Sequence, residues 1–151
     1  MRIAVIFVAA LAFGFISCSR GPDGTITHRD RDGHPDQWVY RIDKDTYKIA
    51  IDTNGDRRPD VVKTYKNNEL VEIESDRNFD GQVDLVQEYS HGLLIRETHD
   101  DNFDGKPEKI GEFSHGKLAI VERDPQERGY IDIVEYYDES GKLTRREVRH
   151  K

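Results

Sequence analysis

Cysteine is almost absent from the sequence, which has only Cys18 among its 151 residues. A chain with one cysteine cannot form an internal disulfide, so its stability must come from other interactions. Helical periodicity is missing too, because no segment of ten or more residues keeps an apolar face at the spacing of an α-helix. With 35% charged and 35% hydrophobic residues, one large buried core is not expected.

Several functional motifs are also missing. There is no serine or cysteine nucleophile motif and no glycine loop of the type that cradles phosphate. The chain has 30 acidic and 23 basic residues and no basic stripe, which argues against a nucleic-acid partner. The six histidines are scattered, and His91 and His115 occupy equivalent places in successive repeats, so they do not indicate a zinc site. We therefore expect a protein without enzymatic activity.

The first residues have the layout of a secretory signal peptide. Arg2 precedes an uncharged apolar run at residues 3–16, and small residues follow it. The run is too short to span a bilayer comfortably. The segment Phe15-Ile16-Ser17-Cys18 resembles the cleavage motif of bacterial lipoproteins, in which the cysteine becomes the lipidated first residue. The resemblance implies a signal peptide at 1–17, a lipidated Cys18 with a tether at 18–25, and export to the bacterial outer membrane, on its periplasmic face or at the cell surface.

A nine-residue motif recurs every 24 residues through the rest of the chain. It is clearest in Asp76-Arg77-Asn78-Phe79-Asp80-Gly81-Gln82-Val83-Asp84, with two copies on each side. Five units at a fixed period indicate a repeat protein, here one β domain at residues 26–151. The motif segments, named loop one to loop five, are 28–36, 52–60, 76–84, 100–108 and 124–132.

The motif has the chemistry of a cation-binding loop. Oxygen-bearing side chains stand at positions 1, 3, 5 and 9, and position 7 offers its backbone carbonyl. This donor set suits calcium, which takes six to eight oxygens in a flexible shell, better than magnesium, which requires strict octahedral geometry. The expected calcium ligands are Asp30, Asp32, His34, Asp36, Asp52, Asn54, Asp56, Arg58, Asp60, Asp76, Asn78, Asp80, Gln82, Asp84, Asp100, Asn102, Asp104, Lys106 and Glu108, with His34, Arg58, Gln82 and Lys106 acting through the backbone carbonyl.

The loops do not match the motif equally well. Loops three and four are complete, loop two has Arg57 instead of glycine at position 6, and loop one has His28 at position 1. Loop five has Arg128 at position 5 and Pro125 beside its first acid, so we expect a metal-free cap, as terminal repeats often are. In an alternative interpretation the Asp, Asn and Gly residues serve only as turn formers. The acid at position 9 and the asparagine at position 3 argue against this interpretation, because we expect a plain turn to need neither residue.

Between the loops, each unit has the pattern of a β-hairpin. The first strand is β-branched and aromatic, and the second begins at a repeated leucine. Tight turns are expected at 67–68, 91–92, 115–116 and 140–141. The predicted fold is therefore all-β, an antiparallel meander or open solenoid of five hairpins and ten strands joined by calcium-type loops. The expected first strands are 37–41, 61–65, 85–89, 109–113 and 133–137.

Known calcium loops share the motif in part. An EF-hand requires flanking helices and a glutamate at position 12, where this chain has Lys63, Gln87 and Gly111. The loops are also similar to those of dockerins, thrombospondin type 3 repeats and integrin-type propellers. From Asp30 to Val148 the chain resembles bacterial lipoproteins built from Asp-x-Asn-x-Asp-Gly-x-x-Asp loops and hairpins.

The lipoprotein resemblance implies a non-enzymatic, calcium-binding module of the cell envelope, with an unidentified protein or polysaccharide as partner. The alternative is a metal-independent scaffold or adhesion protein. Trp38 and the strand tyrosines leave two interpretations open, a carbohydrate-stacking face or aromatic cross-strand pairs, of which we favour the second.

Overall fold

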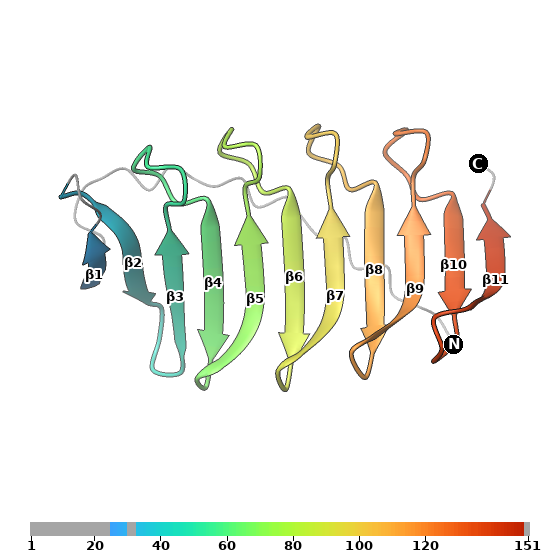
Figure 1. The fold of residues 1–151 in the computed structure, drawn as a ribbon, viewed down its shortest axis with the longest axis horizontal. Helices are drawn as coiled ribbons and strands as arrows, with labels where there is room; N and C mark the ends of the chain where they lie inside the picture. The colour runs from blue at the N-terminus through green and yellow to red at the C-terminus, as the bar shows by residue number, and fades with distance from the viewer. Residues whose placement is uncertain (1–24, 30–32, 150–151) are drawn as a thin grey trace.

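The computed structural model describes residues 25–29 and 33–149, which form one antiparallel sheet of eleven strands (Figure 1). The strands lie side by side in chain order, so the predicted all-β meander is confirmed. None of the described residues belongs to a helix that could cross a membrane. The strands are β1 (Thr25–Arg29), β2 (Pro35–Arg41), β3 (Thr46–Ile51), β4 (Val61–Lys66), β5 (Glu69–Ser75), β6 (Leu85–Ser90), β7 (Leu93–His99), β8 (Lys109–Ser114), β9 (Lys117–Arg123), β10 (Ile133–Tyr137) and β11 (Leu143–Val148).

Strand β1 is the one strand beyond the ten that the sequence predicts. It takes in residues expected to end the tether and to begin loop one, and it pairs antiparallel with β2. This pairing gives hydrogen-bond partners to backbone groups of β2 that would otherwise form an open edge. The predicted signal peptide, the lipidated Cys18 and most of its tether, together with Asp30 and Asp32, lie outside the described residues.

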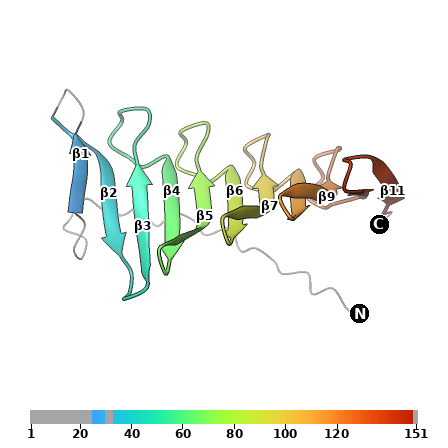
Figure 2. The ribbon, with the colours of Figure 1, turned by 60° about the horizontal axis from the view of Figure 1, so that its bottom comes forward.

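The sheet is a single layer, because each described strand contacts only its neighbours in the chain. Consistent with the composition, the buried hydrophobic residues are few: Ala50, Val62, Val121 and Val134. Figure 2 shows the pronounced twist of the sheet along its length. In a sheet without a second layer, cross-strand side-chain pairs supply the packing that a core would otherwise provide.

A central row of side chains crosses the sheet at intervals of 12 residues. Each member lies directly opposite the next, so all of them share one face. The 24-residue repeat is thus two strands of 12 residues each, counted with their connections. The row consists of Trp38, Ala50, Val62, Glu74, Val86, Thr98, Ile110, Glu122 and Val134.

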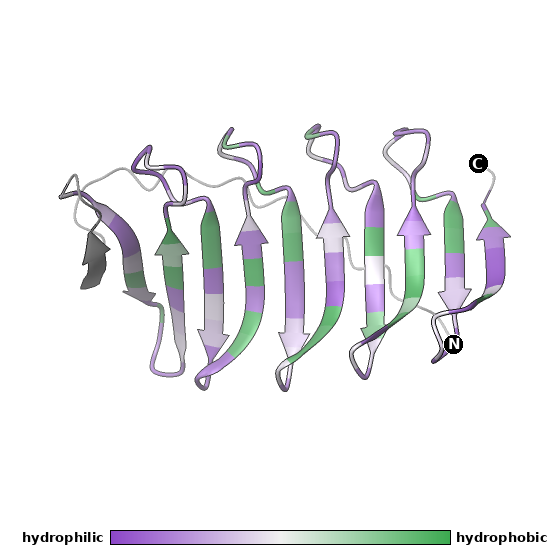
Figure 3. Cartoon of the chain, viewed as in Figure 1, coloured by the Kyte–Doolittle hydropathy of each residue, from purple (hydrophilic) through white to green (hydrophobic). Residues whose placement is uncertain are grey.

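The opposite face carries a stripe of aromatic and leucine side chains near the hairpin turns. Tyr47 stacks on Tyr65 with ring centroids 4.9 Å apart, and similar cross-strand pairs of an aromatic residue with leucine follow in each later hairpin. Trp38 lies in the central row, on the other face, so it does not join Tyr47 and Tyr65 in one aromatic surface. Figure 3 shows the hydrophobic bands on the strands and the hydrophilic character of the long loops.

The connections differ between the two ends of the strands, and the side of the sheet that carries the long loops is named the loop edge. The long loops all project from one edge and the hairpin turns from the other (Figure 1). The predicted turns at His91-Gly92 and His115-Gly116 have positive φ angles at both residues, 50° and 76° in each case. Two consecutive residues of this kind match the right-handed twist of the adjoining strands. The repeat therefore presents loops two to five on the same edge (Figure 1).

Candidate metal centre

The acids at positions 1 and 9 of successive loops form one continuous row along the loop edge. They lie two residues beyond the central row, and backbone hydrogen bonds extend the ladder through them; for example, Asp76 N–H donates to Asp60 O at 2.7 Å, and Asp100 N–H donates to Asp84 O at 2.8 Å. The side chains of this row are mostly buried, with Asp52, Asp60, Asp76, Asp84, Asp100, Asp124 and Asp132 each 8% exposed or less. The row also includes Asp36 and Glu108, which are partly exposed.

In loops two, three and four, each of these acids accepts hydrogen bonds from backbone N–H groups of its own loop. The acid at position 1 accepts from positions 4 to 6, and the acid at position 9 accepts from positions 2 and 3. In loop three, Asp76 accepts from Phe79 and Gly81, both at 2.7 Å, and Asp84 accepts from Arg77 at 2.6 Å. Loops two and four repeat this pattern. These bonds fix the loop backbone and aim the carboxylates inward.

Positions 3 and 5 continue the same scheme. The asparagine at position 3 accepts from the N–H of position 5 at 2.8 to 3.0 Å. The aspartate at position 5 accepts from the N–H of position 7 at 2.8 to 2.9 Å. The expectation that a plain turn needs neither the asparagine at position 3 nor the acid at position 9 is therefore wrong, because both residues have a role in holding the turn.

The loop backbone takes a left-handed conformation at positions 4 and 6. In loop three these are Phe79 and Gly81, with φ of 65° and 91°. In loop two the glycine has changed place, so that Gly55 stands at position 4 with φ of 81° and Arg57 at position 6 with φ of 74°. Arg57 is therefore not a disruption of the loop, since loop two keeps the backbone shape of its neighbours.

Two loops bring three carboxylates together. In loop two, oxygens of Asp52, Asp56 and Asp60 lie within 4.8 Å of one another, and in loop four the same holds for Asp100, Asp104 and Glu108. Two unit charges at this separation repel each other by on the order of 3 kcal/mol at an effective dielectric constant of about 20, before screening by solvent. These clusters correspond to positions 1, 5 and 9, the acidic positions of the predicted calcium loops.

Loop three, although complete in sequence, is not among the three-acid clusters that the described residues form. Here the side-chain amide of Asn78 donates to Asp80 Oδ2 at 2.9 Å, and Gln82 Nε2 lies 3.5 Å from the same oxygen. These neutral donors hold the position 5 carboxylate. Burial raises the pKa of Asp84, against hydrogen bonds from backbone N–H groups that lower it, and the charges of Asp76 and Asp80 raise it further.

Loop one is described only in part. His34 at position 7 is 2.7 Å from a guanidinium nitrogen of Arg57 in loop two, and Asp36 at position 9 lies in β2. The other expected ligands of this loop, Asp30 and Asp32, fall among the residues that are not described. Calcium binding by loop one therefore stays a prediction.

Loop five departs from the other loops at position 5, as the sequence indicates. The guanidinium of Arg128 donates a hydrogen bond to Asp132, the acid at position 9. Burial alone would raise the pKa of Asp124, but hydrogen bonds from the N–H groups of Arg128, Tyr130 and Gly129 outweigh it and the pKa is lowered. Loop five thus keeps two acids of the motif and gives one of them a cationic partner from the same loop.

Three side-chain hydrogen bonds were not predicted from the sequence. The Thr53 hydroxyl donates to Asp60 at 2.6 Å. Arg77 of loop three donates to Asp100 O and to Asp101 Oδ1 of loop four, both at 2.8 Å, and joins the two loops; the pKa of Asp101 is lowered, first by this hydrogen bond. The one trace of this pair in the sequence is the opposite charge of Arg77 and Asp101, which both stand at position 2 of their loops.

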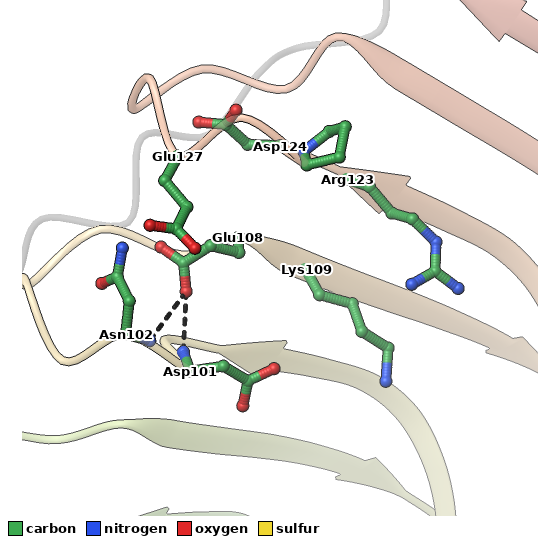
Figure 4. Close-up of a pocket in the computed structure, with 8 residues that line it drawn as sticks. Asp101, Asn102, Glu108, Lys109, Arg123, Asp124 and Glu127 are labelled. Carbon is green, nitrogen blue, oxygen red and sulfur yellow. Dashed lines mark hydrogen bonds between the residues drawn. The ribbon is translucent and has the colours of Figure 1, made fainter.

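A cleft of about 290 Å³ lies between loops four and five. Figure 4 shows the side chains of Glu108 and Glu127 extending toward each other there, while Lys109 and Arg123 extend in another direction. Glu108 also accepts from the N–H of Asp101 at 2.7 Å. The carboxylates at this part of the loop edge therefore come from two neighbouring loops.

No protein-family model matches the chain, and no curated protein matches it. Among solved structures, it is similar to the pneumococcal O-GlcNAc transferase GtfA in complex with UDP and GlcNAc, at 12% identity and a TM-score of 0.49, covering 78% of this chain and 21% of that one. It is also similar to a chain of the accessory secretory protein 1, 2 and 3 structure from Streptococcus pneumoniae, at 19% identity and a TM-score of 0.46, covering 73% and 21%. The chain spans about a fifth of each of those proteins, and similarity at this level indicates neither their activity nor their assembly for this chain.

Proposed function

We propose that this protein is a non-enzymatic, calcium-binding β-repeat module of the cell envelope, in which ions at the loop edge stabilise the sheet. Loops two and four are the leading sites, and the acidic ligands of loop two are Asp52, Asp56 and Asp60. The asparagine at position 3 and the carbonyl at position 7 would complete each shell. Loops one and three would bind more weakly or require a rearrangement of their side chains.

The observation that carries the proposal is the buried row of acids along the loop edge. Each member has carboxylate neighbours on the adjoining strands or in its own loop, and neutral N–H donors do not cancel the negative charge of the row. A single-layer sheet has little hydrophobic burial with which to offset this repulsion. Divalent cations would neutralise the row and link the strands that flank each loop.

The affinity expected of these loops is high enough for bound calcium to stabilise the fold. Loops without a bidentate glutamate at position 12 resemble low-affinity extracellular sites, with a Kd on the order of 0.1 to 1 mM. At about 10 mM calcium, such a site stabilises the folded chain by roughly 1.4 to 2.7 kcal/mol. Two sites would then raise the melting midpoint by on the order of 10 °C.

A second candidate function is a metal-independent scaffold or adhesion module. The backbone hydrogen bonds of the acids favour it, since they satisfy the loops in the manner of ordinary Asx turns. The two candidates differ in what happens when calcium is removed. A metal-independent scaffold would melt at the same temperature with calcium and with chelator, whereas the calcium-binding module would not.

The N-terminal sequence supports a proposal for where the protein is located. We propose that Cys18 carries a lipid that attaches the protein to the outer membrane, and that the sheet meets a protein or polysaccharide partner. Metabolic labelling of the expressed protein with a fatty acid, with Cys18→Ala as control, tests the anchor. Label retained in the Cys18→Ala variant would contradict it.

A further inference from the structure

Loop five has the same backbone shape as the loops that we propose to bind calcium. Positions 4 and 6 are Glu127 and Gly129, with φ of 53° and 78°. The first acid, Asp124, accepts from the N–H of Gly129 at 2.6 Å, as Asp100 of loop four accepts from Gly105 at 2.7 Å. The difference between loops four and five therefore lies in the side chains.

The side chain that differs most is Arg128 at position 5, where loops two, three and four have aspartate. Its guanidinium donates to Asp132 and lies over the ring of Tyr130, 4.6 Å from the ring centroid. Asp132 is the acid of position 9, which in loops two and four belongs to the three-acid clusters. A positive charge from the chain itself thus stands beside a carboxylate of the loop.

Two carboxylate oxygens of loop five are buried and have no hydrogen-bond partner among the described residues. They are Asp124 Oδ1 and Asp132 Oδ1, on side chains of residues that are 2% and 5% exposed. Unpartnered buried carboxylate oxygens are costly and call for a cation. They stand at positions 1 and 9, where they would be ligands in a calcium-binding loop.

The acidic row also ends at this repeat. In the place where the first acid of a sixth loop would stand, Arg149 donates its backbone N–H to Asp132 O at 2.6 Å. The side chain of Arg149 is 3.8 Å from Glu122, an acid of the central row. Arginine therefore occupies two positions at the C-terminal end of the sheet where the preceding loops have acids.

We propose that loop five is a cation site in which Arg128 serves as the resident counter-ion. The guanidinium offsets the charge of the buried Asp132, beside Asp124, which backbone N–H groups hold, and it keeps the last repeat closed without calcium. With an acid at position 5, the same loop takes a divalent cation through Asp124, residue 128 and Asp132. The metal-binding part of this inference rests on the function proposed above, whereas the counter-ion part does not.

The test compares Arg128→Gln, Arg128→Asp and Arg128→Lys in the full-length protein, with Lys142→Gln as a control that removes one positive charge from the exposed turn of the same repeat. In excess chelator, Arg128→Gln is expected to lower the melting midpoint by about 5 °C more than Lys142→Gln does, and Arg128→Lys to preserve most of the midpoint. Equal midpoints for Arg128→Gln and Lys142→Gln would overturn the counter-ion role, whatever the wild-type protein does with calcium.

Titration with calcium chloride by calorimetry tests the site itself. Arg128→Asp is expected to bind one more calcium ion than wild type and to regain its midpoint when calcium is added. A variant that is unfolded in chelator and folds on adding calcium gives the same support. An unchanged stoichiometry, or a variant that stays unfolded with calcium, would overturn the cation site; no binding by the wild-type protein would instead contradict the function proposed for loops two and four.

Discussion

Asp84 in loop three and Asp124 in loop five are buried to the same extent, each 2% exposed, but their pKa values move in opposite directions. Burial raises the pKa of Asp84, and the charges of Asp76 and Asp80 add to the effect of burial. For Asp124, hydrogen bonds from backbone N–H groups outweigh burial and lower the pKa. The comparison shows that two equally buried acids have pKa shifts of opposite direction because their hydrogen bonds and neighbouring charges differ.

The comparison predicts that replacing aspartate with asparagine has different effects on stability at these two positions. In chelator at pH 7, Asp124→Asn is expected to destabilise the protein by about 2 kcal/mol, because it replaces a carboxylate that accepts several N–H groups. Asp84→Asn is expected to leave stability unchanged or higher, since its amide oxygen can still accept from Arg77 without a negative charge. Urea denaturation measures both, and destabilisation of equal size would contradict the distinction.

The same pair has a defined pH dependence. The folded-state pKa of Asp124 lies below its unfolded value of about 4, so its stabilisation is present above that pH and is lost as the pH falls through the folded pKa. The folded-state pKa of Asp84 lies above its unfolded value, so its charge opposes folding above the folded pKa and has no effect below the unfolded one. Stability curves of the two variants against pH should therefore diverge as the pH rises from about 4 to 7.

Among the described residues, loop four has a three-acid cluster and loop three does not. Replacing the aspartate at position 5 with alanine in each loop tests whether this difference affects calcium binding. Asp104→Ala is expected to remove one calcium site and about 1.4 to 2.7 kcal/mol of stabilisation at about 10 mM calcium, because Asp104 belongs to a three-acid cluster. Asp80→Ala should have a smaller effect on calcium binding, since amide groups already hold its carboxylate. Calorimetric stoichiometry measures both. If neither variant changes it, the loops are not the binding sites.

Loop two differs from the others by its arginine at position 6, which predicts a smaller effect. Arg57→Gly is expected to raise stability by up to about 1 kcal/mol, because glycine takes a φ of 74° without the steric cost that an arginine bears. The lost contact with His34 reduces this gain. Thermal melting in chelator measures the change, and a clear loss of stability would mean that this contact outweighs the backbone strain.

The smallest effect on stability is expected in the last hairpin turn, between β10 and β11, on the side of the sheet opposite the long loops. The Ser140 hydroxyl and the N–H of Lys142 lower the pKa of Asp138 in the last hairpin turn, so Asp138→Asn should slightly lower the midpoint at pH 7 and have no effect below the folded pKa. The change should be the same with calcium and with chelator. A calcium-dependent change would show that acids outside the loop edge also respond to the ion.

The strands and hairpin turns were accessible from the sequence because their signals are local. The abundance of β-branched and aromatic residues predicted a strand at 133–137, and β10 spans the same residues. The His91-Gly92 turn followed from the residue types that tolerate positive φ. The left-handed conformation of Phe79 and Phe103 had no such signal, because aromatic residues rarely adopt it.

The relations between repeats were harder to predict, since they depend on the register of the sheet. The continuous row of acids appears only when each strand is aligned with the next, and the Arg77 contact joins residues 24 positions apart. The sequence identified Arg128 as a departure from the motif, but not its bond to Asp132. The positions of the candidate ligands were thus predictable, whereas their charge partners in neighbouring strands and loops were not.

The central claim, that bound calcium is part of this fold, is tested most directly by melting the protein followed by circular dichroism in about 10 mM calcium, in magnesium at the same concentration and in excess chelator. We expect the midpoint to rise by on the order of 10 °C with calcium relative to chelator, and by much less with magnesium. Coincident curves in calcium and chelator would contradict the claim and identify the loops as plain turns.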